Sequence, residues 1–207
     1  MGGRTQPVLT YYANPCTPAV RAAMAAGRLG TICTPLQYQD PAGPDWVADN
    51  GCFSDKWDPD RWWTWLDALP RTARFAVVPD VVADWAATLE RWDQWAPRVA
   101  AAGHKVAVVA QDGATPATVP WHQIDAVFIG GSTTWKLGAD AIDIMGEAQA
   151  RGVWVHVGRV NSRRRLRWAA AHGANSVDGT LLTWGPDKHL APLLAWLREV
   201  NTQGVLL

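Results

Sequence analysis

The chain has 207 residues, of which 48% are hydrophobic, so it is long enough for one substantial core and short for two domains. Nineteen basic and nineteen acidic side chains cancel, which excludes a strong overall field for polyanions and confines any nucleic-acid contact to a local patch. The chain shows no membrane span and no leader pattern, and Cys16, Cys33 and Cys52 lack CxxC or zinc-ligand spacing, so we expect reduced thiols in a cytosolic protein.

Short apolar runs alternate with longer segments of helical period, a pattern typical of βα units around a parallel sheet. Eight runs predict strands, at residues 8–14, 29–34, 45–50, 74–80, 105–112, 126–131, 154–159 and 176–180. Eight parallel strands predict a compact (β/α)8 barrel of the TIM type, forming one domain over residues 1–207. An open doubly wound sheet is the alternative, because the pattern does not itself show closure.

Caps and apolar stripes predict the helices between these strands. The predicted helices cover residues 18–26, 84–102, 139–150 and 162–172, and a last one begins near Leu190. The run 35–44 carries several Pro and Gly residues and predicts no full crossover helix. Most of the fourteen tryptophans are expected to pack in the core or between helices.

Polar or small residues follow most of the predicted strands. They are Asn14, Asp49, Asp80, Gln111, Asp112, Gly130, Gly131, Arg159 and Asp178. In a parallel barrel the loops after the strands converge over one mouth, so these residues are expected to surround one cavity. For a single Asp or Asn, capping of the next helix is the alternative role. The pair Gly130 and Gly131 predicts backbone N–H groups open to a ligand carbonyl.

Two of these carboxylates suit glycosyl transfer. Asp49 and Asp178 can divide the work, one attacking an anomeric carbon while the other manages the proton of the leaving or entering base. Asp80 and Gln111 can bind the edge of a purine, with the carboxylate facing N–H donors and the amide facing a carbonyl. His156 alternates with valines inside a strand and is interpreted as a core or wall residue.

A cluster of arginines begins the seventh βα unit. Its members are Arg159, Arg163, Arg164, Arg165 and Arg167, beside the N-terminus of a predicted helix. This is the one local patch suited to phosphate. A solvated helix face is the alternative interpretation, and Arg159 fits it least because it stands at a strand end.

These motifs, taken in order, resemble the tRNA-guanine transglycosylase family, in the short form found in phage genomes and associated with 7-deazaguanine in DNA. The similarity runs from about Trp46 to Asp187. The segment Asp49-Asn-Gly-Cys-Phe53 is similar to the family's DSGGFQ motif, whose aspartate is the acid/base. Asp80 in AVVPD resembles its base-recognising aspartate, with Asp84 as a second candidate, and Gln111 in VVAQDG resembles the glutamine of its IIQG strand.

The later motifs follow in the same order. Ile129-Gly130-Gly131 resembles the family's VGG segment, which contacts the base through its backbone. Val157-Gly158-Arg159 resembles its GVG segment, and Asp178 in the next strand is similar to its nucleophilic aspartate. The family's C-terminal cysteine-rich zinc segment has no counterpart, since no cysteine follows Asp178.

The resemblance implies a DNA-guanine transglycosylase that exchanges guanine for a 7-deazaguanine such as the free 7-cyano base, without a cofactor. Asp178 would attack C1′ and expel guanine, the incoming base would displace Asp178, and Asp49 would relay the proton. The implied substrate contacts are Asn50, Phe53, Asp80, Gln111, Gly130, Gly131 and Gly158, and the implied DNA-backbone contacts are Arg159, Arg163 and Arg164. A DNA target must be single-stranded or flipped out of its duplex.

Three other functions stay open. The same exchange on tRNA would use the same active-site residues, although the missing zinc segment favours DNA. A non-catalytic nucleobase- or nucleic-acid-binding barrel would not need both Asp49 and Asp178. An unrelated barrel enzyme would bind a small phosphorylated metabolite at residues 158–165.

Overall fold

Eight short strands form the inner wall of the fold, and each lies inside a predicted run. They are β1 (Thr10–Ala13), β2 (Gly30–Cys33), β3 (Trp46–Ala48), β4 (Ala76–Val77), β5 (Val106–Ala110), β6 (Ala126–Ile129), β7 (Trp154–Val157) and β8 (Ser176–Asp178). The structure is a computed structural model that describes residues 8–37, 40–54 and 56–203. The strands are shorter than predicted because most of the polar residues at their ends belong to the loops.

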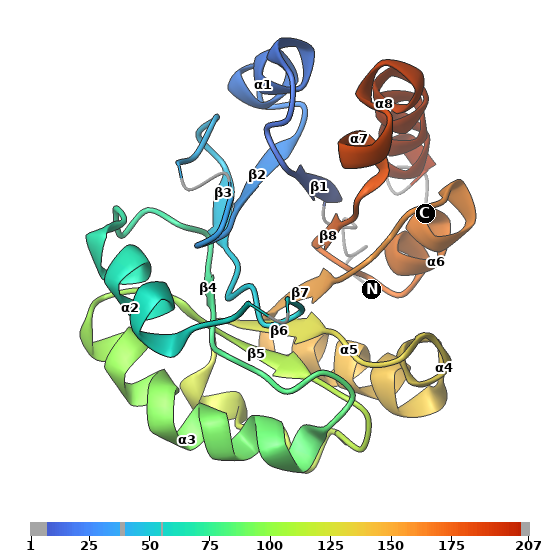
Figure 1. Ribbon diagram of the computed structural model, residues 1–207. Coiled ribbons are helices and arrows are strands. Elements are labelled where there is room, and N and C mark those ends of the chain that lie inside the picture. The colour runs from blue at the N-terminus through green and yellow to red at the C-terminus, as the bar shows by residue number, and fades with distance from the viewer. Residues whose placement is uncertain (1–7, 38–39, 55, 204–207) are drawn as a thin grey trace.

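The sheet closes on itself. Each strand pairs in parallel with the next, and β1 also pairs with β8, with Thr10 opposite Ser176 and Tyr12 opposite Asp178. The helices lie outside the strands as a surrounding ring (Figure 1). The (β/α)8 barrel is therefore confirmed, and the open doubly wound sheet is excluded.

The predicted helices are all present. They are α1 (Pro18–Ala25), α3 (Trp85–Ala101), α5 (Ala139–Arg151), α6 (Arg163–Ala171) and α8 (Pro186–Gln203). The last begins four residues before the predicted start at Leu190. Between β2 and β3 the described residues form no helix, as predicted, and residues 38 and 39 of that link lie outside the described part of the chain.

Four helical segments were not predicted. They are α2 (Pro59–Ala68), the 3-10 turn η1 (Trp121–Gln123), α4 (Thr133–Lys136) and α7 (Leu181–Trp184). The signals for α2 are present in the sequence, because Asp58 accepts the N–H of Arg61 as an N-cap and Pro59 follows at the first helical position. The other three span only three or four residues, too short to show a helical period.

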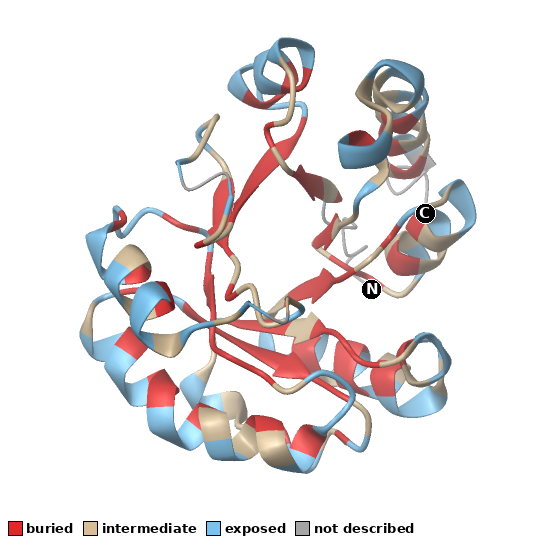
Figure 2. Ribbon diagram, in the orientation of Figure 1, coloured by how far each residue is buried: buried red, intermediate tan, exposed pale blue. Residues whose placement is uncertain are grey.

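Burial follows the barrel geometry. The strands are buried almost throughout, whereas the outer faces of the helices are exposed (Figure 2). The stripe predicted for α3 packs inward through Trp85, Trp92, Ala96 and Val99. All fourteen tryptophans lie in the described residues, and Trp184 is the one that is exposed, which confirms their expected packing.

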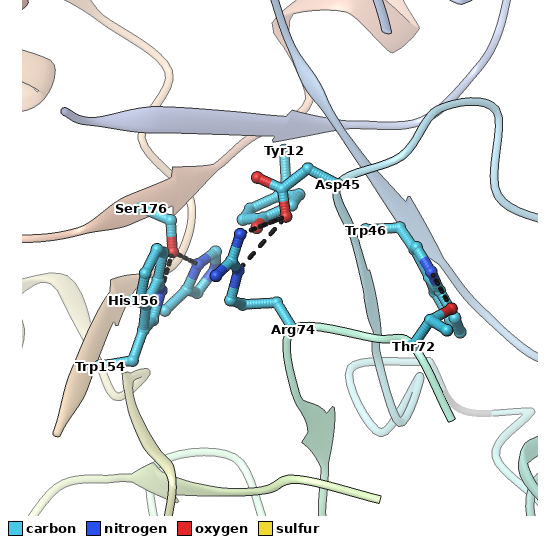
Figure 3. Close-up of polar contacts among 8 residues, drawn as sticks. All are labelled: Tyr12, Asp45, Trp46, Thr72, Arg74, Trp154, His156 and Ser176. Atoms are coloured by element: carbon cyan, nitrogen blue, oxygen red, sulfur yellow. Dashed lines mark hydrogen bonds and ion pairs between the residues drawn. The ribbon is translucent and has the colours of Figure 1, made fainter. Parts of the chain in front are cut away.

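His156 of β7 faces the barrel interior as a wall residue. Its side chain is fully buried, and Nδ1 lies 2.8 Å from Ser176 Oγ, to which the indole of Trp154 also donates (Figure 3). Its ring packs on Phe128 with centroids 4.4 Å apart. Burial, together with the charge of Lys136, lowers the pKa of His156 to about 3, so the imidazole is neutral. The interpretation of His156 as a core residue is confirmed.

A polar cluster closes the end of the barrel at which the strands begin (Figure 3). Tyr12 Oη donates to Asp45 Oδ1 at 2.8 Å, and Arg74 Nη2 lies 3.3 Å from the same oxygen. The Arg74 guanidinium also stacks 4.7 Å from the ring centroid of Trp154. These contacts fix the ring of Tyr12, which fills the space above Gly30 of the neighbouring strand.

Gly30→Ala is expected to destabilise the fold by about 1–3 kcal/mol, because the new Cβ would overlap the ring of Tyr12, which is completely buried. Gly146→Ala is the matched control, since a Cβ at that position of α5 meets nothing within 4 Å. In a helix interior this control is expected to gain about 0.5–1 kcal/mol. Urea unfolding checks both changes, and a Gly30→Ala midpoint at or above that of the unaltered protein would contradict the packing argument.

Candidate active site

Successive side chains of a strand point to opposite faces of the sheet, so every second side chain points into the barrel. Tyr12, Val47, Val109 and Phe128 pack in its interior. Because the strands are parallel, the inward residues that follow them meet at one end of the barrel. Five residues come two positions after a residue that points into the barrel, and all of them line one cavity. They are Asn14, Asp49, Gln111, Gly130 and Asp178.

The cavity at this end has a volume of about 420 Å³, within the range of small-molecule sites. Most of the predicted site residues line it, namely Asp49, Asn50, Phe53, Asp80, Gln111, Gly130, Gly131, Arg159 and Asp178. Gly158 lies behind its wall, where a Cβ would come within 2.5 Å of Phe128 and 3.5 Å of Asp178 Oδ1. The convergence expected from the strand ends is therefore present.

Asp178 is the last residue of β8 and has two differently placed oxygens. Its Oδ1 accepts the backbone N–H of Arg159 at 2.5 Å, whereas its Oδ2 accepts no hydrogen bond from the described residues. Burial raises the pKa of Asp178, and the Arg159 N–H and the positive charges of Lys136 and Arg159 oppose that rise. These groups favour the carboxylate form, and Oδ2 is free to act as a nucleophile.

Asp49 follows β3 and faces the same cavity. Its Oδ1 accepts the N–H of Gly51 at 3.4 Å. Burial first, and then the charge of Asp178, raise the pKa of Asp49 to about 7, with a smaller contribution from Asp80. A carboxyl group that titrates near neutrality can both give and take a proton at the working pH. The two carboxyl groups are thus suited to different roles.

Asp80 is held by two amide side chains. Asn50 Nδ2 donates to its Oδ1 at 2.7 Å, and Gln111 Nε2 donates to its Oδ2 at 2.5 Å. The oxygen of Gln111 is also engaged, because it accepts the N–H groups of Ala83 at 2.9 Å and Gly131 at 2.7 Å. Burial raises the pKa of Asp80, and the two amides oppose that rise. Gln111 therefore orients Asp80 and the loops beside it.

The pair Gly130 and Gly131 lines the cavity without free N–H groups. Gly130 N–H donates to Ala110 O at 3.0 Å, and Gly131 N–H donates to Gln111. The expectation of N–H groups open to a ligand is therefore wrong for this arrangement, because the carbonyl of Ala110 in β5 and the side chain of Gln111 after it already accept them. Glycine is required here for space, since a Cβ at residue 130 would lie 2.7 Å from Val109.

Two other acidic residues after strands have structural roles. Asp84 is exposed and caps α3, accepting the N–H of Ala87 at 3.0 Å. Asp112 accepts the backbone N–H and the hydroxyl of Ser132, both at 2.6 Å. Of the two candidates for the base-recognising aspartate, Asp80 is the one that lines the cavity.

Arg159 turns its side chain toward the cavity wall. Its backbone has a φ of 61°, unusual for a residue with a side chain. The guanidinium donates to Gly131 O and lies 5.5 Å from the ring centroid of Phe53, which is 73% exposed at the cavity edge. Arg159 thus joins the loops after β3, β6 and β7.

Arg163 and Arg164 lie in the first turn of α6 and are exposed. Neither is among the residues that line the cavity. Arg163 pairs with Glu199 of α8 at 2.7 Å. Their contact with a nucleic-acid backbone stays a prediction, and their setting resembles the solvated helix face that was its alternative.

Lys136 is a buried charge that the sequence did not single out. It is 6% exposed, and its Nζ donates to Gly158 O at 2.5 Å. Burial and the charge of Arg159 lower its pKa to about 7. No sequence signal marks it, because it ends the four-residue helix α4. The cavity edge also includes Asn161, Thr180 and Trp184, which were not predicted.

In the described part of the chain, no three His, Cys, Asp or Glu side chains gather in a way that could hold a metal ion. None of its helices combines the length and apolar character needed to cross a membrane. None of the three cysteines, all of which lie in the described residues, takes part in a disulfide bond.

The fold and cavity define a TIM-type (β/α)8 barrel with a pocket at the carboxyl ends of its strands, where three aspartates lie among apolar side chains. No family model matches the chain, and no curated protein matches it either.

Solved structures match over nearly the whole chain. Tryptophan synthase from M. tuberculosis matches with a TM-score of 0.54 and 14% identity over 97% of this chain and 93% of that one. The 3-hexulose-6-phosphate synthase from Salmonella typhimurium gives 0.57 and 14%, over 95% and 99%. The Amycolatopsis orientalis BexX/CysO complex gives 0.58 and 16%, over 98% and 90%. At these identities the matches show the fold alone.

Proposed function

We propose that the protein is a DNA-guanine transglycosylase, a pentosyltransferase that exchanges guanine for a 7-deazaguanine base. The observation that carries this proposal is the pairing of Asp178 and Asp49 in one cavity, with a free Oδ2 on the first and a pKa near 7 on the second. The order of the sequence motifs supports the same assignment.

The reaction consists of two displacements. Asp178 Oδ2 attacks C1′ as the C1′–N9 bond breaks, and the leaving guanine takes the bonding electrons and a proton from Asp49. The free 7-deazaguanine then gives a proton to ionised Asp49 and attacks C1′, which releases the Asp178 carboxylate. Two inversions retain the configuration at C1′.

Recognition of the base is assigned to Asp80. Asp80 is 6% exposed and its carboxylate is fixed by Asn50 and Gln111, so its remaining lone pairs are pre-oriented. A carboxylate that faces the cavity suits the N1–H and 2-amino donors on the edge of guanine. Phe53, exposed at the cavity edge, offers a ring on which a base can stack.

The choice of DNA over tRNA rests on the resemblance of the sequence motifs to the short form of the family that is associated with 7-deazaguanine in DNA. Exchange on tRNA is the alternative, since the residues that line the cavity serve both substrates. A non-catalytic binding barrel is less favoured, because binding alone does not need a second carboxyl group poised near neutrality beside Asp178.

The test is an exchange assay. The protein is incubated with single-stranded DNA or with tRNA, each carrying labelled guanine, and with excess 7-cyano-7-deazaguanine. Release of label from DNA with incorporation of the new base supports the proposal. Release from tRNA alone moves the assignment to RNA, and no release from either polymer overturns it.

A further inference from the structure

Lys136 is a buried charge that the proposed reaction does not use. The charged or titratable groups near enough to interact with it are Arg159, Arg165 and Asp178, together with His156, which is neutral. Burying an ammonium group is costly unless an opposite charge or strong acceptors compensate. Among these groups Asp178 alone is acidic, which ties Lys136 to the candidate nucleophile.

One peptide group joins Lys136 to Asp178. The carbonyl oxygen of Gly158 accepts from Lys136 Nζ at 2.5 Å, and the N–H of the same peptide, from Arg159, donates to Asp178 Oδ1 at 2.5 Å. The C=O and N–H of a trans peptide point in opposite directions, so the ammonium and the carboxylate stand at the two ends of one dipole. Linked hydrogen bonds of this kind strengthen each other.

The backbone at this peptide also requires support. Arg159 has a φ of 61°, in the left-handed region that side chains disfavour. Gly158 cannot carry a side chain, because a Cβ would lie 2.5 Å from Phe128. The bond from Lys136 to Gly158 O therefore anchors the peptide in the orientation that points its N–H at Asp178.

We infer that Lys136 is a positioning residue for the nucleophile, which acts through the Gly158–Arg159 peptide to hold Asp178 ionised and oriented. The inference rests on the proposed function for its catalytic meaning. Lys136 does not itself reach a ligand, because it is absent from the lining of the 420 Å³ cavity. It borders a separate cavity of about 10 Å³, too small for anything beyond one water molecule.

The experiment is a titration that does not depend on activity. Protein labelled with ¹³C at aspartate carboxyls is titrated by NMR, and the Asp178 signal is assigned by its loss in Asp178→Asn. In Lys136→Met we expect the Asp178 midpoint to rise by about one pH unit, a tenfold change in proton affinity. Lys136→Arg, which keeps the charge and the donors, is expected to restore it. Lys105→Met removes an exposed lysine at the far end of the barrel and is expected to change nothing.

Kinetics give the second measurement. In Lys136→Met, the pH below which adduct formation slows should rise by the same amount as the Asp178 midpoint. KM for the free base should stay within about twofold of its value in the unaltered protein. An unshifted Asp178 midpoint in folded Lys136→Met overturns the inference, as does a loss confined to KM. If Lys136→Met does not fold, Lys136→Gln is judged by the same titration. A shifted midpoint in a protein without exchange activity upholds the charge coupling and overturns the proposed function instead.

Discussion

Asp178→Asn is expected to abolish base exchange, with a loss of at least about 10⁴-fold, because an amide cannot form the glycosyl ester that links the two displacements. The change is small in structural terms. The asparagine oxygen can still accept the Arg159 N–H that binds Oδ1, so the cavity keeps its shape. The loss therefore reports on the nucleophile and not on the fold.

The covalent intermediate supplies the direct measurement. The protein is mixed with DNA without free base, which would release the adduct, and a denaturing gel is run for a protein–DNA adduct, which should be present in the unaltered protein and absent in Asp178→Asn. Asp140→Asn is the matched control, since Asp140 is exposed in the first turn of α5 and away from the cavity. An adduct of equal intensity in Asp178→Asn would assign the nucleophile elsewhere.

Asp49→Asn is expected to slow adduct formation by about 10²–10⁴-fold, the usual contribution of a general acid. The pKa of Asp49 is about 7, so its acid form, which protonates the leaving guanine, is lost as the pH rises above that value. Adduct formation by the unaltered protein should decline above about pH 7, and Asp49→Asn should lack that decline. Single-turnover rates from pH 5 to 9 test this, and an unchanged profile in the variant would remove Asp49 from the proton relay.

The same substitution is expected to stabilise the fold at neutral pH. The unfolded Asp49 carboxyl ionises near pH 4, whereas the folded one keeps its proton up to about pH 7. Between these values the native state binds more protons, so its stability falls as the pH rises. Asparagine cannot ionise, and the melting temperature of Asp49→Asn should exceed that of the unaltered protein at pH 8 but not at pH 4. A variant that melts lower at pH 8 would contradict the raised pKa.

Much of the barrel was predictable from local patterns. Strand positions follow from apolar runs of four to eight residues, and helix ends follow from residues such as Thr17 and Ser162, whose side chains do cap α1 and α6. The candidate site was predictable from the sequence for a related reason. Parallel strands bring their carboxyl ends to one face, so Asp49, Asp80 and Asp178 had to approach each other once the strands were placed.

The tertiary structure alone decided which donors and charges these residues meet. Closure of the sheet depends on the pairing of β1 with β8. The hydrogen bonding of Asp178 depends on the N–H of Arg159, which lies 19 residues away. The burial of Lys136 depends on a carbonyl 22 residues away, and the N–H of Gly131 is taken by Gln111, 20 residues away.

By itself, then, the sequence determined where the elements lie and which residues end them, because these properties depend on neighbours along the chain. Only the folded barrel decided that Asp80 and not Asp84 faces the cavity, that the glycine N–H groups are already bonded, and that Lys136 bonds the peptide that donates to Asp178. Hydrogen-bond partners and burial are set by contacts between strands far apart in the sequence, and no local pattern records them.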